Sequence, residues 1–102
     1  METVRDLVAT HGAAPYPSEL VGSAEVGGVA LILLDADITG FATTFLENGG
    51  ALRPDQWRML RDCAADARTV VPQLTGEAWV YFGRLYALSQ ALLRAEPVAP
   101  AG

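Results

Sequence analysis

Two aspartates, Asp35 and Asp37, come closest to a catalytic or metal-binding pair in this sequence of 102 residues. Paired carboxylates can hold Mg²⁺, or one can act as an acid and the other as a base. That chemistry needs both groups on one side of their element, as on a strand, where side chains repeat every second residue. On a helix, residues two apart point about 200° away from each other. We expect a helix here, and therefore a structural role for both aspartates.

His11 is the only histidine and Cys63 the only cysteine, so a nucleophilic dyad would need these two residues. Cys63 lies at the flank of a predicted helix stripe, where an inert thiol is common. His11 lies in the last turn of a predicted helix, where an imidazole suits the helix end. Gly27-Gly28 and Gly49-Gly50 lack the other residues of phosphate and dinucleotide loops. We predict no enzymatic activity, no metal and no cofactor.

The composition is that of a globular, acidic protein. Hydrophobic residues make up 51% of the chain and charged residues 19%, which is too apolar for a disordered chain. Twelve acidic and seven basic residues give a net charge of -5, and every basic residue is an arginine. Because phosphate affinity is mostly electrostatic, an acidic chain without a basic block is poorly suited to nucleic acid. A single cysteine excludes an intrachain disulfide.

We find no targeting or membrane-spanning signal in the sequence. The longest apolar run, from Val26 to Leu34, is far shorter than the roughly 20 residues that cross a bilayer. The first residues alternate charged and apolar side chains, unlike a signal peptide. We therefore expect a soluble cytoplasmic protein that does not bind membranes, in keeping with its unpaired thiol.

Glycine and proline divide the sequence into four predicted helices, of which the first is short. It covers about residues 2–11, because apolar side chains fall on one face at the spacing i, i+3, i+4, i+7. Thr3 and Asp6 offer a capping pair at its start. Gly12 stands where a helix stop favours glycine.

The second predicted helix runs from Val29 to Glu47, with apolar residues spaced alternately by three and four. Residues 29–34 carry no period of their own, so a strand followed by a helix is the alternative. Asn48-Gly49-Gly50 is a good stop, because these residues tolerate the left-handed conformation. Gly40 interrupts the run and suggests a point where another element approaches closely.

The third predicted helix begins at Pro54 and ends at Pro72, and the fourth follows Thr75, a plausible N-cap. The apolar arc of the fourth helix covers close to half its circumference, wider than plain two-layer packing needs. This helix is therefore central in the domain or shared with a partner.

Together these elements predict an all-α fold: a small compact bundle of one short and three longer helices, packed antiparallel because the connections are short. Residues 1–96 form one domain, and residues 97–102 a flexible tail. The candidate core comprises Leu31, Leu34, Ile38, Phe41, Phe45, Trp57, Leu60, Val71, Phe82, Leu85 and Leu92.

Two groups of residues are candidates for an interface. Trp79, Tyr86 and Leu93 recur every seven residues along one edge of the fourth helix, although burial in the core is the competing explanation. Arg58, Arg61 and Asp62 belong to a mixed-charge face of the third helix, where Arg58 and Asp62 are spaced to pair.

The function we expect from these features is a non-catalytic, acidic protein–protein interaction module that binds a basic partner. By analogy of size and charge alone, it could inhibit its partner as immunity proteins and antitoxins do. One alternative is a helical subunit or homodimer that completes a larger assembly. Another is a bundle that binds a small ligand between its helices.

Overall fold

The computed structural model describes residues 3–20 and 24–97. In chain order the elements are α1 (Val4–Ala13), β1 (Glu25–Val26), β2 (Val29–Ala30), α2 (Leu31–Glu47), α3 (Pro54–Val70), the 3-10 turn η1 (Val71–Gln73) and α4 (Gly76–Arg94). The predicted flexible tail falls outside the described residues, apart from Pro97.

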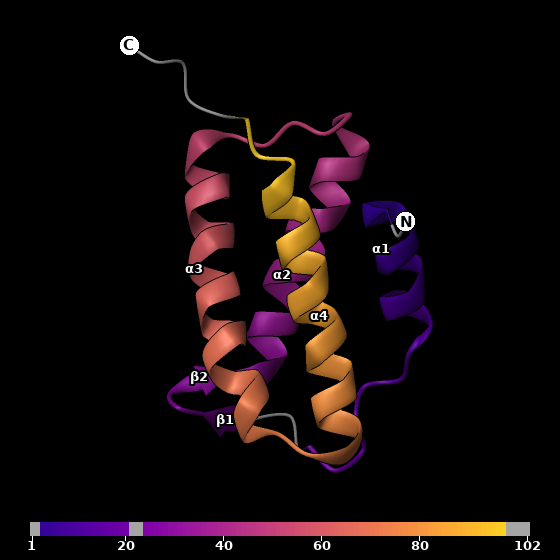
Figure 1. Cartoon of the computed structure of the whole chain (residues 1–102), viewed down its shortest axis with the longest axis vertical. Helices are drawn as coiled ribbons and strands as arrows, with labels where there is room; N and C mark the ends of the chain where they lie inside the picture. Colours follow the sequence, from indigo (N-terminus) through magenta and orange to yellow (C-terminus); the bar gives the residue numbers. More distant parts are fainter. Residues whose placement is uncertain (1–2, 21–23, 98–102) are drawn as a thin grey trace.

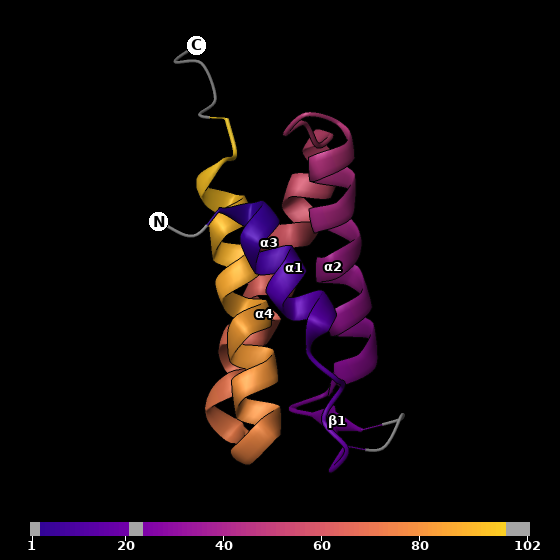
Figure 2. The ribbon, with the colours of Figure 1, turned by 90° about the vertical axis from the view of Figure 1, so that its right-hand side faces the viewer.

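The four helices form an up-and-down bundle (Figure 1). Each helix runs opposite to the one before it, so α2 and α4 point the same way. Helices α2, α3 and α4 all contact one another, and the short α1 covers the junction between α2 and α4 (Figure 2). This arrangement confirms the predicted all-α bundle of one short and three longer helices.

Helix α1 begins where the sequence indicates and ends later. The Thr3 hydroxyl accepts from the Asp6 amide at 3.1 Å, and the Asp6 carboxylate accepts from the Thr3 amide at 3.3 Å, so the capping pair is confirmed. The predicted stop at Gly12 is wrong, because the helix continues to Ala13. Ala14 is extended, as expected for a residue that precedes a proline.

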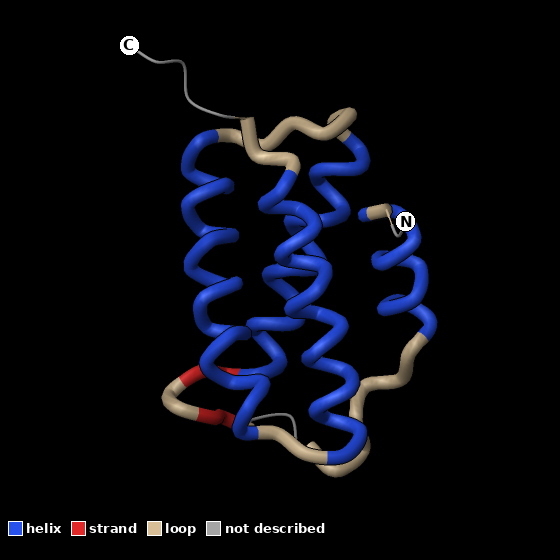
Figure 3. The backbone as a smooth tube through the Cα atoms, viewed as in Figure 1, coloured by secondary structure: helices blue, strands red, loops and turns tan. Residues whose placement is uncertain are grey.

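The segment before α2 forms a small hairpin, which corrects the predicted start of that helix. Strands β1 and β2 pair antiparallel, with Val26 opposite Val29, and appear red in Figure 3. Gly27 and Gly28 have φ angles of 58° and 81°, the left-handed values that a tight hairpin turn requires. The helix therefore starts at Leu31, and the strand-then-helix alternative describes this short stretch correctly.

The rest of α2 follows the prediction except at Gly40. The helix ends at Glu47, and the Gly50 amide donates to the Phe45 carbonyl at 2.8 Å, as a glycine stop requires. A Cβ built on Gly40 meets nothing within 4 Å, so the expected close approach at this residue is wrong.

Helix α4 is capped from a distant part of the chain rather than by its own N-cap residue. The Thr75 side chain makes no capping hydrogen bond, contrary to the prediction. Instead, the Glu19 carboxylate, in the loop after α1, accepts from the Ala78 amide at 2.6 Å. Helix α3 starts at Pro54 as predicted, and it gives way to η1 one residue before Pro72.

The core lies between α2, α3 and α4. Eight of the eleven predicted core residues are buried, whereas Phe41, Phe45 and Val71 are partly buried and pack against the others. The buried residues that the prediction omitted include Ala42, Val70, Tyr81, Leu88 and Ser89.

Candidate functional site

A cluster of three polar side chains joins α1, α2 and α4 beneath the surface. Asp35 on α2 lies at its centre: His11 Nε2 lies 2.7 Å from one carboxylate oxygen, and the Tyr81 hydroxyl donates to the other at 2.7 Å. Because a carboxylate only accepts, His11 carries its proton on Nε2. The His11 and Tyr81 rings also pack together, with their centroids 4.5 Å apart. The cluster therefore fixes α1 to the rest of the bundle.

Burial raises the pKa values of two tyrosines, one in this cluster and one packed against it. Burial raises the pKa of Tyr81 far above its ordinary value of 10.0, and the hydrogen bond to Asp35 adds to the rise. Burial also raises the pKa of Tyr16, whose ring packs against Tyr81. Both phenols therefore remain protonated at neutral pH, which keeps the Tyr81 hydroxyl available as a donor.

The pairing of His11 with Asp35 resembles a catalytic base and the carboxylate that orients it. Two observations favour a structural role. His11 is only 5% exposed. Cys63 lies elsewhere, in a groove lined by residues of α2 and α3. The cluster therefore stabilises the docking of α1, and we assign it no catalytic step.

The sequence alone did not lead to this cluster. We expected His11 to interact with its own helix end and Asp35 to have a structural role, whereas the two residues bind each other. The available signal was that His11 lies on the apolar face of its helix and that Asp35 and Tyr81 flank apolar stripes. Asp37 is exposed and lies in another groove, as expected for residues two apart on a helix.

Asp37 lies in a groove of about 470 Å³ between the hairpin, α2 and α3, hereafter the α2–α3 groove. Leu33, 61% exposed, lies on its α2 side near Asp37, and Cys63 and Asp66 lie on its α3 side. Asp62 does not line the groove, but it neighbours Cys63 in sequence, and its charge acts on the Cys63 thiol. Among the described residues, none of these three aspartates takes part in an ion pair.

The chemistry of Cys63 reflects its position in the α2–α3 groove. Burial raises the pKa of its thiol from 9.0 to about 11, and the charges of Asp37, Asp66 and Asp62 add to the rise. The thiol is therefore protonated at neutral pH and a poor nucleophile. The charges of all three carboxylates act on the Cys63 thiol, so the carboxylates lie around one region of the surface.

The structure separates the residues predicted to form an interface. Trp79 is 54% exposed, whereas Tyr86 and Leu93 are partly buried against the core, so the three do not form one open stripe. On α3, Arg61 pairs with Glu96. The expected pair between Arg58 and Asp62 is wrong: both side chains are exposed and make no ion pair within the described ranges.

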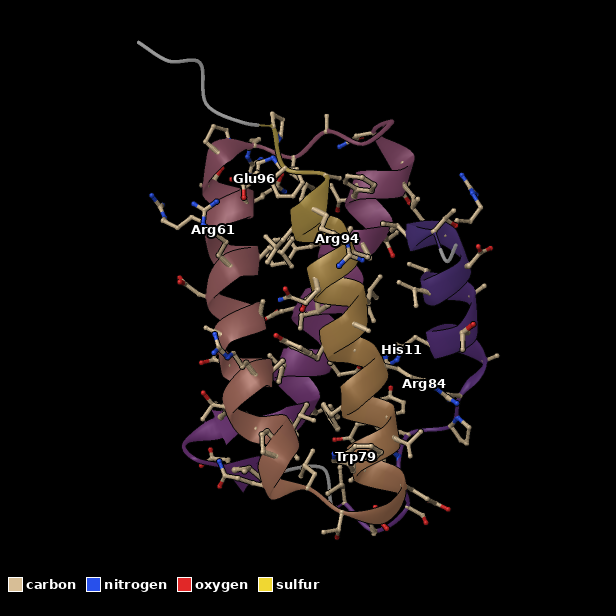
Figure 4. All side chains as sticks on the ribbon, in the orientation of Figure 1. His11, Arg61, Trp79, Arg84, Arg94 and Glu96 are labelled. Carbon is tan, nitrogen blue, oxygen red and sulfur yellow. The ribbon has the colours of Figure 1, made fainter. Side chains whose placement is uncertain are left out.

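Figure 4 shows how the open residues of α4 are placed: Trp79 lies in front of its N-terminal half, and Arg84 extends toward the loop after α1. A second groove, of about 660 Å³, is lined there by residues that include Pro15, Glu77, Trp79, Val80 and Arg84. Val80 is 42% exposed. The predicted wide apolar arc of α4 is therefore accessible at Trp79 and Val80.

No three His, Cys, Asp or Glu side chains in residues 3–20 and 24–97 gather closely enough to hold a metal ion. None of the helices in those ranges has the length and hydropathy to cross a bilayer. Comparisons with protein-family models, with curated proteins and with solved structures find no match for this chain.

Proposed function

We propose that this protein is a non-catalytic interaction module that binds a basic protein through the α2–α3 groove. The observation that carries the proposal is the combination of the exposed side chain of Leu33 with three carboxylates, those of Asp37, Asp62 and Asp66, that make no ion pair within residues 3–20 and 24–97. Arginine or lysine side chains of a partner would pair with the carboxylates, and an apolar partner residue would cover Leu33.

The charge of the whole molecule supports this choice of partner. A net charge of -5 attracts a basic protein over a distance of about 10 Å at 0.1 M salt and increases its rate of encounter. Met59, one turn before Cys63 on α3, is 49% exposed and extends the apolar area beside the carboxylates. The combination gives both long-range attraction and a contact that excludes water. If the basic partner is an enzyme, binding at this groove would inhibit it.

Affinity capture from a lysate of the source cells tests the proposal with a matched pair of variants. The test variant carries Asp37→Asn, Asp62→Asn and Asp66→Asn. The control carries Asp6→Asn, Glu47→Gln and Asp55→Asn, three acidic residues outside the groove. Both have the same net charge, so a difference between them reports position rather than total charge.

We expect the wild type and the control to retain the same basic protein, with retention that falls as salt rises. The groove variant loses it. Far-UV circular dichroism confirms that both variants are folded. Equal retention by both variants, or retention that salt does not weaken, would contradict binding at this groove.

A further inference from the structure

The N-terminal half of α4 presents an apolar surface away from the α2–α3 groove. Trp79 and Val80 are 54% and 42% exposed, which is unusual for such side chains on a helix that otherwise contributes much of the core. In Figure 2, α4 forms one edge of the bundle; α1 crosses in front of its C-terminal half, and the N-terminal half is uncovered in this view. This face is therefore accessible to another protein.

The charges on this half of α4 are arranged for contact with an identical helix. Glu77 and Arg84 are seven residues apart, so they lie on the same flank of the helix and about 10.5 Å apart along its axis. Both are exposed, and neither takes part in an ion pair in the described parts of the chain. When two such helices pack antiparallel about a two-fold axis, residue 77 of each copy faces residue 84 of the other.

The residues between Glu77 and Arg84 also suit the antiparallel packing of two α4 helices. Val80 lies close to the midpoint between Glu77 and Arg84 along the helix and within about 60° of both around it, so it falls near the two-fold axis, whereas Trp79 lies on the opposite flank of this face. A Cβ built on Gly83 meets nothing within 4 Å, so no other part of the chain covers this residue closely. With residue 77 opposite residue 84, residue 79 of one copy lies opposite residue 82 of the other, one position from Gly83.

Electrostatics also favours α4 over the other surfaces of an acidic chain. Of its twelve acidic residues only Glu77 lies on α4, which also carries Arg84 and Arg94. Contact through this helix therefore leaves the remaining negative charges of the two copies apart.

We infer that two copies of this chain associate through the open face of α4, with Glu77 of each copy paired with Arg84 of the other. The contact is isologous, so each charge pair occurs twice. It leaves the α2–α3 groove of both copies accessible, and the dimer therefore presents two sites of the kind proposed above. The inference does not depend on that proposal, because the two surfaces share no residue.

Sedimentation velocity of single and double charge reversals tests the inference. Glu77→Arg and Arg84→Glu each turn two attractive pairs into two repulsive ones, and each should weaken dimerisation by about tenfold. The double variant restores opposite charges across the axis and should dimerise as the wild type does. An equimolar mixture of the two single variants should form a heterodimer, because each then supplies the charge that the other lacks.

Arg58→Glu, an exposed arginine on α3, is the matched control and should leave dimerisation unchanged. Circular dichroism of each variant checks that the fold is retained. A wild type that stays monomeric up to millimolar concentration would overturn the inference. So would a dimer that the single reversals do not weaken, or one that the double variant and the mixture do not restore.

Discussion

Removing the Tyr81 hydroxyl tests whether the buried cluster holds α1 in place. In Tyr81→Phe the ring and its packing remain, and only the hydrogen bond to the Asp35 carboxylate at 2.7 Å is lost. A hydrogen bond to a charged group contributes about 1.5–3 kcal/mol, because its loss leaves the carboxylate less well satisfied in a partly buried place. For a domain of this size, that loss lowers Tm by roughly 6–24 °C.

Thermal unfolding followed by circular dichroism measures the change, and Tyr86→Phe is the matched control. The Tyr86 hydroxyl makes no hydrogen bond among the described residues, so its removal should change stability by less than about 0.5 kcal/mol. In an Asp35→Asn background the cost of Tyr81→Phe should shrink, because the charged acceptor is gone. Equal effects of the two phenylalanine substitutions would refute the idea that this bond stabilises the bundle.

Four individual positions give further predictions. Gly40→Ala should stabilise the protein by up to about 1 kcal/mol in urea unfolding, since the position is helical and a Cβ meets nothing there. Gly49→Ala should destabilise it by about 1 kcal/mol because its φ is 64°; the same sign for both would contradict this reasoning. The folded protein should react with iodoacetamide more slowly than the urea-unfolded chain between pH 9 and 11, because the folded state raises the pKa of Cys63 to about 11. The stability that this protonated thiol contributes is complete below pH 9 and is lost as the pH rises through 11. Glu96→Gln should change Tm little, because the side chains of the pair with Arg61 are 50% and 27% exposed and solvent weakens their attraction; a large shift in Tm would contradict this.

Much of the fold was predictable because its signals are local. Pro54 and the Asn48-Gly49-Gly50 stop mark helix ends through their own backbone preferences, and the structure places helix ends there. Apolar residues at helical spacing identified most of the core. The two-residue strand Val29–Ala30 was only the alternative to a helix, because a short apolar run has the same pattern in a strand and in a helix.

The contacts between distant segments were not predictable in this way. The bond between His11 and Asp35 joins residues 24 positions apart, and the cap from Glu19 to Ala78 spans 59 positions. No spacing rule within one helix indicates which side chains of another helix will face it. The pair of Arg58 with Asp62 is absent among the described residues for another reason. A spacing that allows a pair on one helix does not fix the rotamers of two exposed side chains.

The single cysteine provides the most direct measurement of the proposed function, because Cys63 lines the α2–α3 groove. Its alkylation rate, followed by mass spectrometry, can be compared for the free protein and for its complex with the captured basic protein. We predict that the partner slows alkylation of Cys63 and that added salt restores the free rate as the complex dissociates. An equal rate in the free protein and in the intact complex would show that the partner binds elsewhere and would contradict the proposed function.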